Sequence, residues 1–127
     1  MSNPQSPSGR EAGNGYSLAQ ASLNGHGVAL AISGEIDIAN AQAFTDEVHA
    51  LFNGANSELT LDFQNCVFID SAGIRALVVL AHEQQARGRT LKLSGVTGEP
   101  ERVLRLSGLL DSDLLEEGLT SNQNPPT

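Results

Sequence analysis

Apolar and polar positions alternate with two different periods along the chain, and the two periods predict strands and helices. Apolar residues at every second position indicate half-buried strands, and the segments with this spacing are 16–23, 27–36, 58–65 and 90–95. Apolar residues at every third or fourth position indicate amphipathic helices, and the segments with this spacing are 40–53, 70–87 and 100–107. The predicted order is β-β-α-β-α-β-α, followed by a short apolar segment at 109–115 that the pattern does not assign.

This order predicts an α/β fold with a mixed sheet. Asn24-Gly25 lies between the first two strands and is a hairpin signal, so we expect these strands to be antiparallel. A helix separates each later pair of strands, which predicts right-handed crossovers and parallel pairing. We expect Asn40 to cap the first helix and Gly54 to follow its last turn. The predicted fold is a sheet of four or more strands with helices mainly on one face.

Composition limits the size of the domain and its surroundings. Residues 1–14 and 120–127 consist mostly of Ser, Pro, Gly, Asn and Gln, which predicts disordered tails around one domain at residues 15–119. The net charge of −8 argues against binding to nucleic acid or to anionic lipid. No apolar run approaches the roughly 20 residues that cross a bilayer, and no signal peptide precedes the domain. We therefore expect a cytoplasmic protein without direct membrane insertion.

The helix predicted at residues 70–87 has two apolar faces. One stripe, expected to face the core, consists of Ile74, Leu77, Val78 and Ala81. The opposite side carries Ala72, Ala76, Val79, Leu80 and Glu83. Either a neighbouring helix covers this second side, or the side is a partner surface of small apolar residues with Arg75 on its flank.

The start of the same helix carries an abrupt change of chemistry. The apolar run at residues 67–69 ends in Asp70-Ser71-Ala72-Gly73, just before the helical pattern begins. This position predicts that Ser71 lies at or near the N-cap, where side-chain oxygens meet unpaired backbone N–H groups. Added negative charge is tolerated at the same place. Ser71 is therefore either a structural cap or a switch.

Catalysis by Ser71 is disfavoured because the sequence offers no base for it. The histidines are His26 in a predicted turn, and His49 and His82 well inside predicted helices. A nucleophilic serine needs a base and an orienting acid, and the chain has no Gly-x-Ser-x-Gly elbow. The dispersed histidines and the single Cys66, which we expect to be a buried hydrophobe, give no metal-ligand spacing. With no phosphate-binding glycine loop either, we expect no enzyme activity, no cofactor and no metal.

Two carboxylates are expected at one edge of the sheet. Asp37 follows the second predicted strand, and Asp70 precedes Ser71. The carboxyl ends of parallel strands meet at one edge, which is where α/β folds usually place their sites. The alternative is that both acids only cap helices or turns.

The sequence resembles the STAS domain, specifically the bacterial anti-sigma factor antagonists. Two motifs carry the resemblance: residues 34–39 (GEIDIA), and residues 61–63 (LDF) followed by 67–74 (VFIDSAGI). Element order and spacing also fit from about Tyr16 to Leu119. Either motif alone is a weak signal, and the two together in a chain of this size are more specific.

The resemblance implies a phosphorylation switch. It makes Ser71 the acceptor of phosphate from an anti-sigma factor serine kinase with a histidine-kinase-type ATPase fold, and Asp70 its acidic neighbour. The unphosphorylated antagonist binds that kinase and releases the sigma factor, and a phosphoserine phosphatase resets the switch. Gly73 would allow close approach of the partner's backbone, and Asp37 would line the same surface. Many family members carry a second hydroxyl where this chain has Ala72, so one hydroxyl remains in the motif.

Combined with the helix faces, the resemblance defines a predicted partner surface. Its residues are Asp37, Asp70, Ser71, Ala72, Gly73, Arg75, Ala76 and Val79. The alternatives are a STAS subunit of a membrane lipid-transport ATPase complex, the cytosolic domain of an anion transporter, an enzyme that uses Ser71, and an orphan scaffold whose Ser71 is only a cap.

Overall fold

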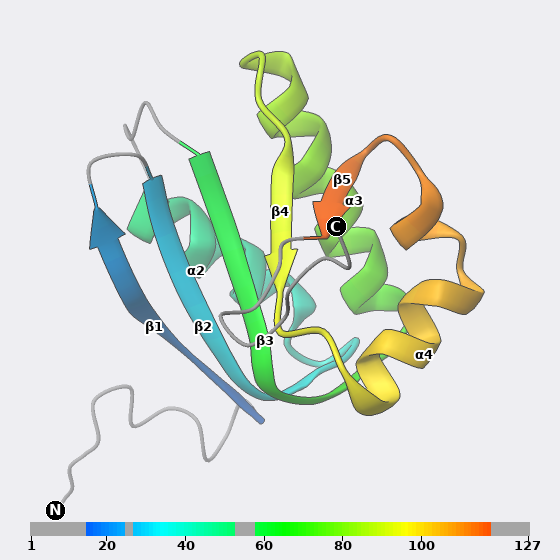
Figure 1. The fold of residues 1–127 in the computed structure, drawn as a ribbon. Helices are drawn as coiled ribbons and strands as arrows, with labels where there is room; N and C mark the ends of the chain where they lie inside the picture. The colour runs from blue at the N-terminus through cyan, green and yellow to red at the C-terminus, as the bar shows by residue number, and fades with distance from the viewer. Residues whose placement is uncertain (1–14, 25–26, 53–57, 118–127) are drawn as a thin grey trace, which may run out of the picture.

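A five-stranded sheet forms the centre of the computed structural model, which describes residues 15–24, 27–52 and 58–117 (Figure 1). Its strands, in the order in which they lie side by side, are β1 (Tyr16–Asn24), β2 (Gly27–Ile36), β3 (Glu58–Ile69), β4 (Leu91–Ser94) and β5 (Leu115–Glu117). β1 is antiparallel to β2, and every later pair is parallel. The mixed sheet expected from the sequence is therefore confirmed.

The helices lie mainly on one face of this sheet. α2 (Ala41–Phe52) and α3 (Ser71–Ala86) lie behind the sheet in Figure 1, and α4 (Gly98–Leu106) lies beside the β4 end. The segment that the pattern left unassigned forms a 3-10 turn, η2 (Leu109–Asp111), and the start of the edge strand β5. Gly25, Gly54, and the tail residues 1–14 and 118–127 lie outside the described residues, so the predictions made for them stay predictions.

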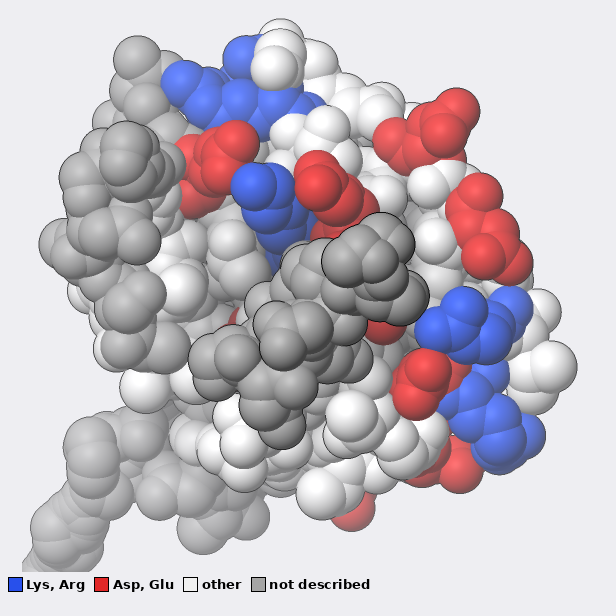
Figure 2. All heavy atoms as spheres, viewed as in Figure 1, with Lys and Arg blue, Asp and Glu red and all other residues white. Residues whose placement is uncertain are grey.

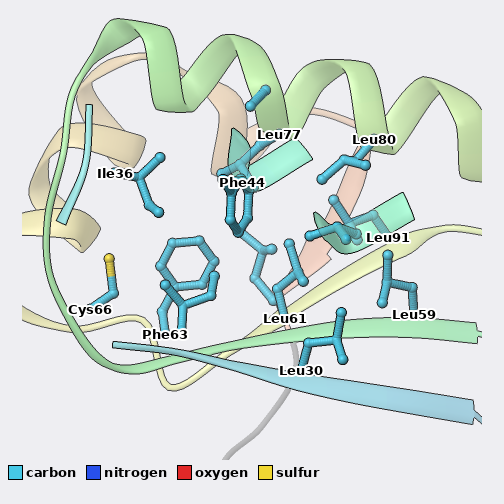
Figure 3. Close-up of a cluster of buried hydrophobic side chains, with 14 of the residues drawn as sticks. Leu30, Ile36, Phe44, Leu59, Leu61, Phe63, Cys66, Leu77, Leu80 and Leu91 are labelled. Carbon is cyan, nitrogen blue, oxygen red and sulfur yellow. The ribbon is translucent and has the colours of Figure 1, made fainter. Parts of the chain in front are cut away.

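The core lies between the sheet and the two helices behind it. β2 turns Val28, Leu30 and Ile32 into this core, as its two-residue spacing predicts. Figure 3 shows Leu77 and Leu80 pointing from α3 towards the strands. Because these side chains are almost completely buried, the middle of α3 is packed firmly against the sheet.

The buried stripe of α3 differs from the predicted one. Ala76 and Leu80, expected on the outer side, are buried to 6% and 2% exposure, whereas Ile74 and Val78 are only partly buried at the edge of the core. The physical reason is that α3 contacts α2 as well as the sheet. A helix covered from two directions buries a stripe rotated towards its neighbour, and the sequence period does not show where that neighbour lies.

Candidate functional site

The residue that caps α3 is Asp70, as the capping alternative predicted, and Ser71, expected at or near the N-cap, lies directly after it. Asp70 has an extended backbone, and its Oδ1 accepts hydrogen bonds from the backbone N–H groups of Ala72 (2.9 Å) and Gly73 (3.1 Å). These are the second and third residues of the helix, which an N-cap carboxylate normally reaches. Ser71 is therefore the first helical residue, and it is exposed to solvent.

Asp70 also ties the start of α3 to the turn that follows β2. Its Oδ2 accepts a hydrogen bond from the Ile38 N–H (3.2 Å), and its own N–H donates to the Ile36 carbonyl (3.2 Å). β2 and β3 run in parallel and end opposite one another, with Ile36 paired to Ile69. The carboxyl edge of the sheet therefore brings the two sequence motifs together.

The same turn is built on Asp37 and Asn40. Asp37 Oδ1 accepts from the Ala39 N–H (2.9 Å), so this carboxylate stabilises the turn in the way the capping alternative predicted. Asn40 is buried; its Oδ1 accepts from the Asp37 N–H (2.9 Å), and its Nδ2 donates to the Glu35 carbonyl (3.0 Å). These side-chain bonds of Asn40 run back into the turn, while its carbonyl accepts from the Phe44 N–H at the start of α2 (2.8 Å). The turn that presents Ile38 is thus internally braced.

A groove of about 360 Å³ lies between α2 and the N-terminal half of α3. Ile38 and Val79 are on its lining and are 82% and 42% exposed, and Ala72 and Arg75 line it between them. Ile38 was not among the predicted partner residues. The available signal was an isoleucine placed directly after the acidic turn residue Asp37, outside either helical stripe.

Gly73 and Ala76 take positions different from the ones predicted. A Cβ atom on Gly73 would lie 2.5 Å from Ile69 Cγ1 and 3.0 Å from Ile36 Cγ2. The missing side chain of Gly73 thus faces the core and lets α3 approach the strand ends, so close approach to a partner's backbone does not explain it. Ala76 is buried beneath the groove. The exposed part of the predicted surface consists of Ser71, Arg75 and Val79, and Asp37, Asp70 and Ala72 are partly exposed.

Arg75 brings a positive charge to the lining of the groove between α2 and α3. In the described part of the chain, Arg75 is exposed and takes part in no ion pair. On the face of the molecule that Figure 2 shows, Lys and Arg side chains lie next to Asp and Glu side chains. The ion pairs of the described residues include Lys92 with Glu58 and Arg105 with Glu101. No continuous basic patch forms on that face.

The remaining chemistry of the described residues offers little for catalysis. His49 Nε2 lies 2.8 Å from Glu83 Oε1 and joins α2 to α3. Burial raises the pKa of the Cys66 thiol to about 11, so the thiol stays protonated at neutral pH and is a poor nucleophile. Within residues 15–24, 27–52 and 58–117, no three His, Cys, Asp or Glu side chains come together to hold a metal ion. Over the same residues, no helix has the length and apolarity needed to cross a bilayer.

Comparison with known proteins assigns the family. A family model described as "Mlab, STAS domain" matches residues 19–116, most of the chain, and the protein therefore belongs to the STAS domain family. Among curated proteins, none matches this sequence.

Solved structures of similar fold include several anti-sigma factor antagonists. A candidate antagonist from Thermotoga maritima is 23% identical with a TM-score of 0.61, over 74% of this chain and 80% of that one. An antagonist from Mycobacterium paratuberculosis is 21% identical with a TM-score of 0.61, over 73% and 80%. The phosphorylated form of the Bacillus cell fate determinant SpoIIAA is 19% identical with a TM-score of 0.59, over 80% and 91%. At these identities the likeness establishes the fold.

Proposed function

We propose that this protein is an anti-sigma factor antagonist whose binding to an anti-sigma factor kinase is controlled by phosphorylation of Ser71. The observation that carries the proposal is the position of Ser71: it is exposed, it is the first residue of α3, and it follows the Asp70 cap beside the groove that Ile38 and Val79 line. The unphosphorylated protein binds the kinase, which frees the sigma factor. A phosphoserine phosphatase restores the binding form, and the protein itself has no catalytic turnover.

The partner surface of this proposal has an apolar part and a polar part. Ile38 and Val79 supply exposed apolar area, and such residues contribute most when a partner closes over them and excludes water. Arg75, which has no ion-pair partner within the described residues, would pair with an acidic residue of the kinase. Other residues of the predicted surface support it from below, because they fix the turn and the start of α3: Asp37, Asp70, Gly73 and Ala76.

A phosphate on Ser71 would oppose this association without unfolding the domain. It adds a charge of about −1.5 to −2 at neutral pH. The positive end of the α3 dipole tolerates that charge, but the Ala72 and Gly73 N–H groups already bind Asp70 Oδ1. A partner that covers Ala72 and Val79 would have to desolvate the phosphate next to the Asp70 carboxylate. A loss of about 3 kcal/mol in binding free energy would weaken the complex roughly a hundredfold.

The test is phosphorylation by candidate kinases. The purified protein is incubated with ATP and with each anti-sigma factor kinase of the source organism, and the product is mapped by mass spectrometry. We expect one phosphate on Ser71 and none in Ser71→Ala. The matched control is Thr97→Ala, because Thr97 is also an exposed hydroxyl residue at a helix start. Phosphorylation that persists in Ser71→Ala would contradict the proposal. Failure of every tested kinase to phosphorylate the parent protein would contradict it as well.

The extent of the folded domain belongs to the same proposal. We place it at residues 15–119 between short tails and in the cytoplasm. Limited proteolysis should trim the ends and leave a core of about 100 residues, because chain ends with few contacts are cleaved first. Rapid cleavage between Phe44 and Leu93 would contradict this assignment.

The second candidate function is that of a STAS subunit in a membrane lipid-transport ATPase complex. The observation in its favour is the matched family model, whose description names Mlab. Affinity purification from the source organism separates the two candidates. Recovery of a membrane ATPase complex in place of a soluble kinase would favour the second.

A further inference from the structure

A second hollow lies between the C-terminal halves of α2 and α3, at the opposite end of α3 from Ser71. Its volume is about 430 Å³, which is within the range of small-molecule pockets. Ala86 on its lining is exposed, and the larger apolar side chains on the lining are buried: Val48, Phe52, Leu59 and Leu80. Gln84, which also lines it, lies roughly 20 Å along the helix axis from Ser71, so the two hollows occupy different ends of one helix.

Gln84 gives this hollow an unusual polar group. Its side chain is 2% exposed, and its Oε1 accepts no hydrogen bond within the described part of the chain. A buried acceptor without a donor destabilises a folded protein, so most buried polar groups are paired. The terminal amide of glutamine rotates readily about its last side-chain bond, so an occupant could draw the oxygen towards itself. Gln84 is therefore suited to accept a hydrogen bond from a bound molecule.

The rim of the hollow carries charges of both signs. Glu83 is bonded to His49 across the two helices at 2.8 Å, and the Arg87 guanidinium lies 6.0 Å from the centre of the Phe52 ring. One carboxylate and one guanidinium nearly cancel, so the rim gives little attraction to an ion of either sign. Phe52 is only 5% exposed and lies under Arg87, so the exposed guanidinium of Arg87 offers the flat surface on which an aromatic ring can stack. These features favour a neutral, planar ligand.

We propose that this hollow binds a small, neutral aromatic molecule that carries one N–H or O–H donor. The ring stacks on the Arg87 guanidinium at the mouth of the hollow, and the donor bonds to the side-chain oxygen of Gln84. This site is separate from the Ser71 surface and does not depend on the function proposed above. His49 lines both hollows, which makes it the point where they meet.

The experiment compares two probes of nearly equal shape. Indole carries an N–H donor, and benzofuran has an oxygen in its place. Each is titrated into the ¹⁵N-labelled full chain, and the backbone amide shifts are followed by NMR. We expect indole to shift the amides around Phe52 and Leu80 and to bind about tenfold more tightly than benzofuran, which is the effect of one buried hydrogen bond.

One variant tests whether the preference for indole depends on Gln84, and a second variant is the control. Gln84→Met keeps the length of the side chain and removes the acceptor, so it should abolish the preference for indole and raise the melting temperature. Val79→Ser changes the other groove and should leave indole binding unchanged. Equal affinity for the two probes, no binding of indole, or shifts confined to residues elsewhere would overturn the proposal. So would a Gln84→Met protein that still prefers indole; if that variant does not fold, the comparison of probes on the parent protein decides.

Discussion

The two ends of α3 carry hollows that are built in opposite ways. At the N-terminal end the polar groups are satisfied by one another, since Asp70 binds the N–H groups of Ala72, Gly73 and Ile38. What remains exposed there is apolar area, the Ser71 hydroxyl and the Arg75 side chain. At the C-terminal end the larger apolar side chains are buried, and the unpaired group among the described residues is a polar atom, Gln84 Oε1.

This difference indicates two kinds of occupant. An exposed apolar area on a braced turn gains most from a large partner that excludes water over it. A buried acceptor in an apolar hollow gains most from a small molecule that brings its own donor. One helix can therefore serve a protein partner at its start and a small ligand at its end.

The bracing of the N-terminal end is tested most strongly by Asp70→Ala. This substitution removes the acceptor of three backbone N–H groups, and we expect the free energy of unfolding to fall by about 2–3 kcal/mol. Asp70→Asn keeps a cap oxygen and should lose less than half as much. Thr97→Ala is a control, because Thr97 makes no side-chain cap bond in α4. Urea denaturation measures all three, and an Asp70→Ala protein as stable as the parent would contradict the bracing.

The apolar character of the first groove is tested by Ile38→Ser and Val79→Ser. Each should weaken binding to the cognate kinase about tenfold, because buried contact area is lost while the Ser71 hydroxyl stays in place. Leu106→Ser is the matched control, since Leu106 is nearly as exposed as Ile38 but lies on α4. Calorimetric titration gives the affinities. Equal losses in all three variants would mean that the groove is not the specific contact.

The contact between the two helices is tested by Glu83→Gln. The His49–Glu83 pair is about half exposed on both sides, so removing its charge should lower stability by less than about 1 kcal/mol. Thermal unfolding measures this change. A loss several times larger would show that the pair holds α2 and α3 together and would remove the independence of the two hollows.

The smallest expected effect is that of Ser71→Ala on stability. The Ser71 hydroxyl is exposed and does not cap the helix, so the free energy of unfolding should change by less than about 0.5 kcal/mol. Urea denaturation beside the parent protein checks this. A larger loss of stability would show that Ser71 has the structural capping role that the sequence analysis left open.

Much of this fold follows from sequence periods. The strands and helices lie close to their predicted segments because their apolar spacing is regular, although β3 continues past the predicted end at residue 65 to Ile69. The Asp37 and Asp70 motifs meet because parallel strands end at one edge. The three-residue β5 and the 3-10 turn before it escaped prediction, since so few residues show no period.

The details of the site required the structure. The buried stripe of α3 depends on where α2 lies: Ala76 and Leu80 are buried, as the alternative of a covering neighbour helix predicted, whereas Val79 on the same side stays exposed. Asp70 and Ser71 are adjacent hydrogen-bonding residues, and only the backbone geometry shows which of them caps the helix. The position of Ile38 directly after Asp37 was a weak signal of its exposure, whereas nothing in the local pattern marked Gln84 as buried, because its burial depends on contacts between segments distant in the sequence.

The central claim is that phosphate on Ser71 releases the partner while the domain stays folded. Calorimetric titration of the cognate kinase with phosphorylated and unphosphorylated protein tests it most directly. We predict affinity about a hundredfold weaker for the phosphorylated protein, with an unchanged unfolding transition. Equal affinities for the two forms would contradict the claim and leave Ser71 as an exposed residue at the start of a helix.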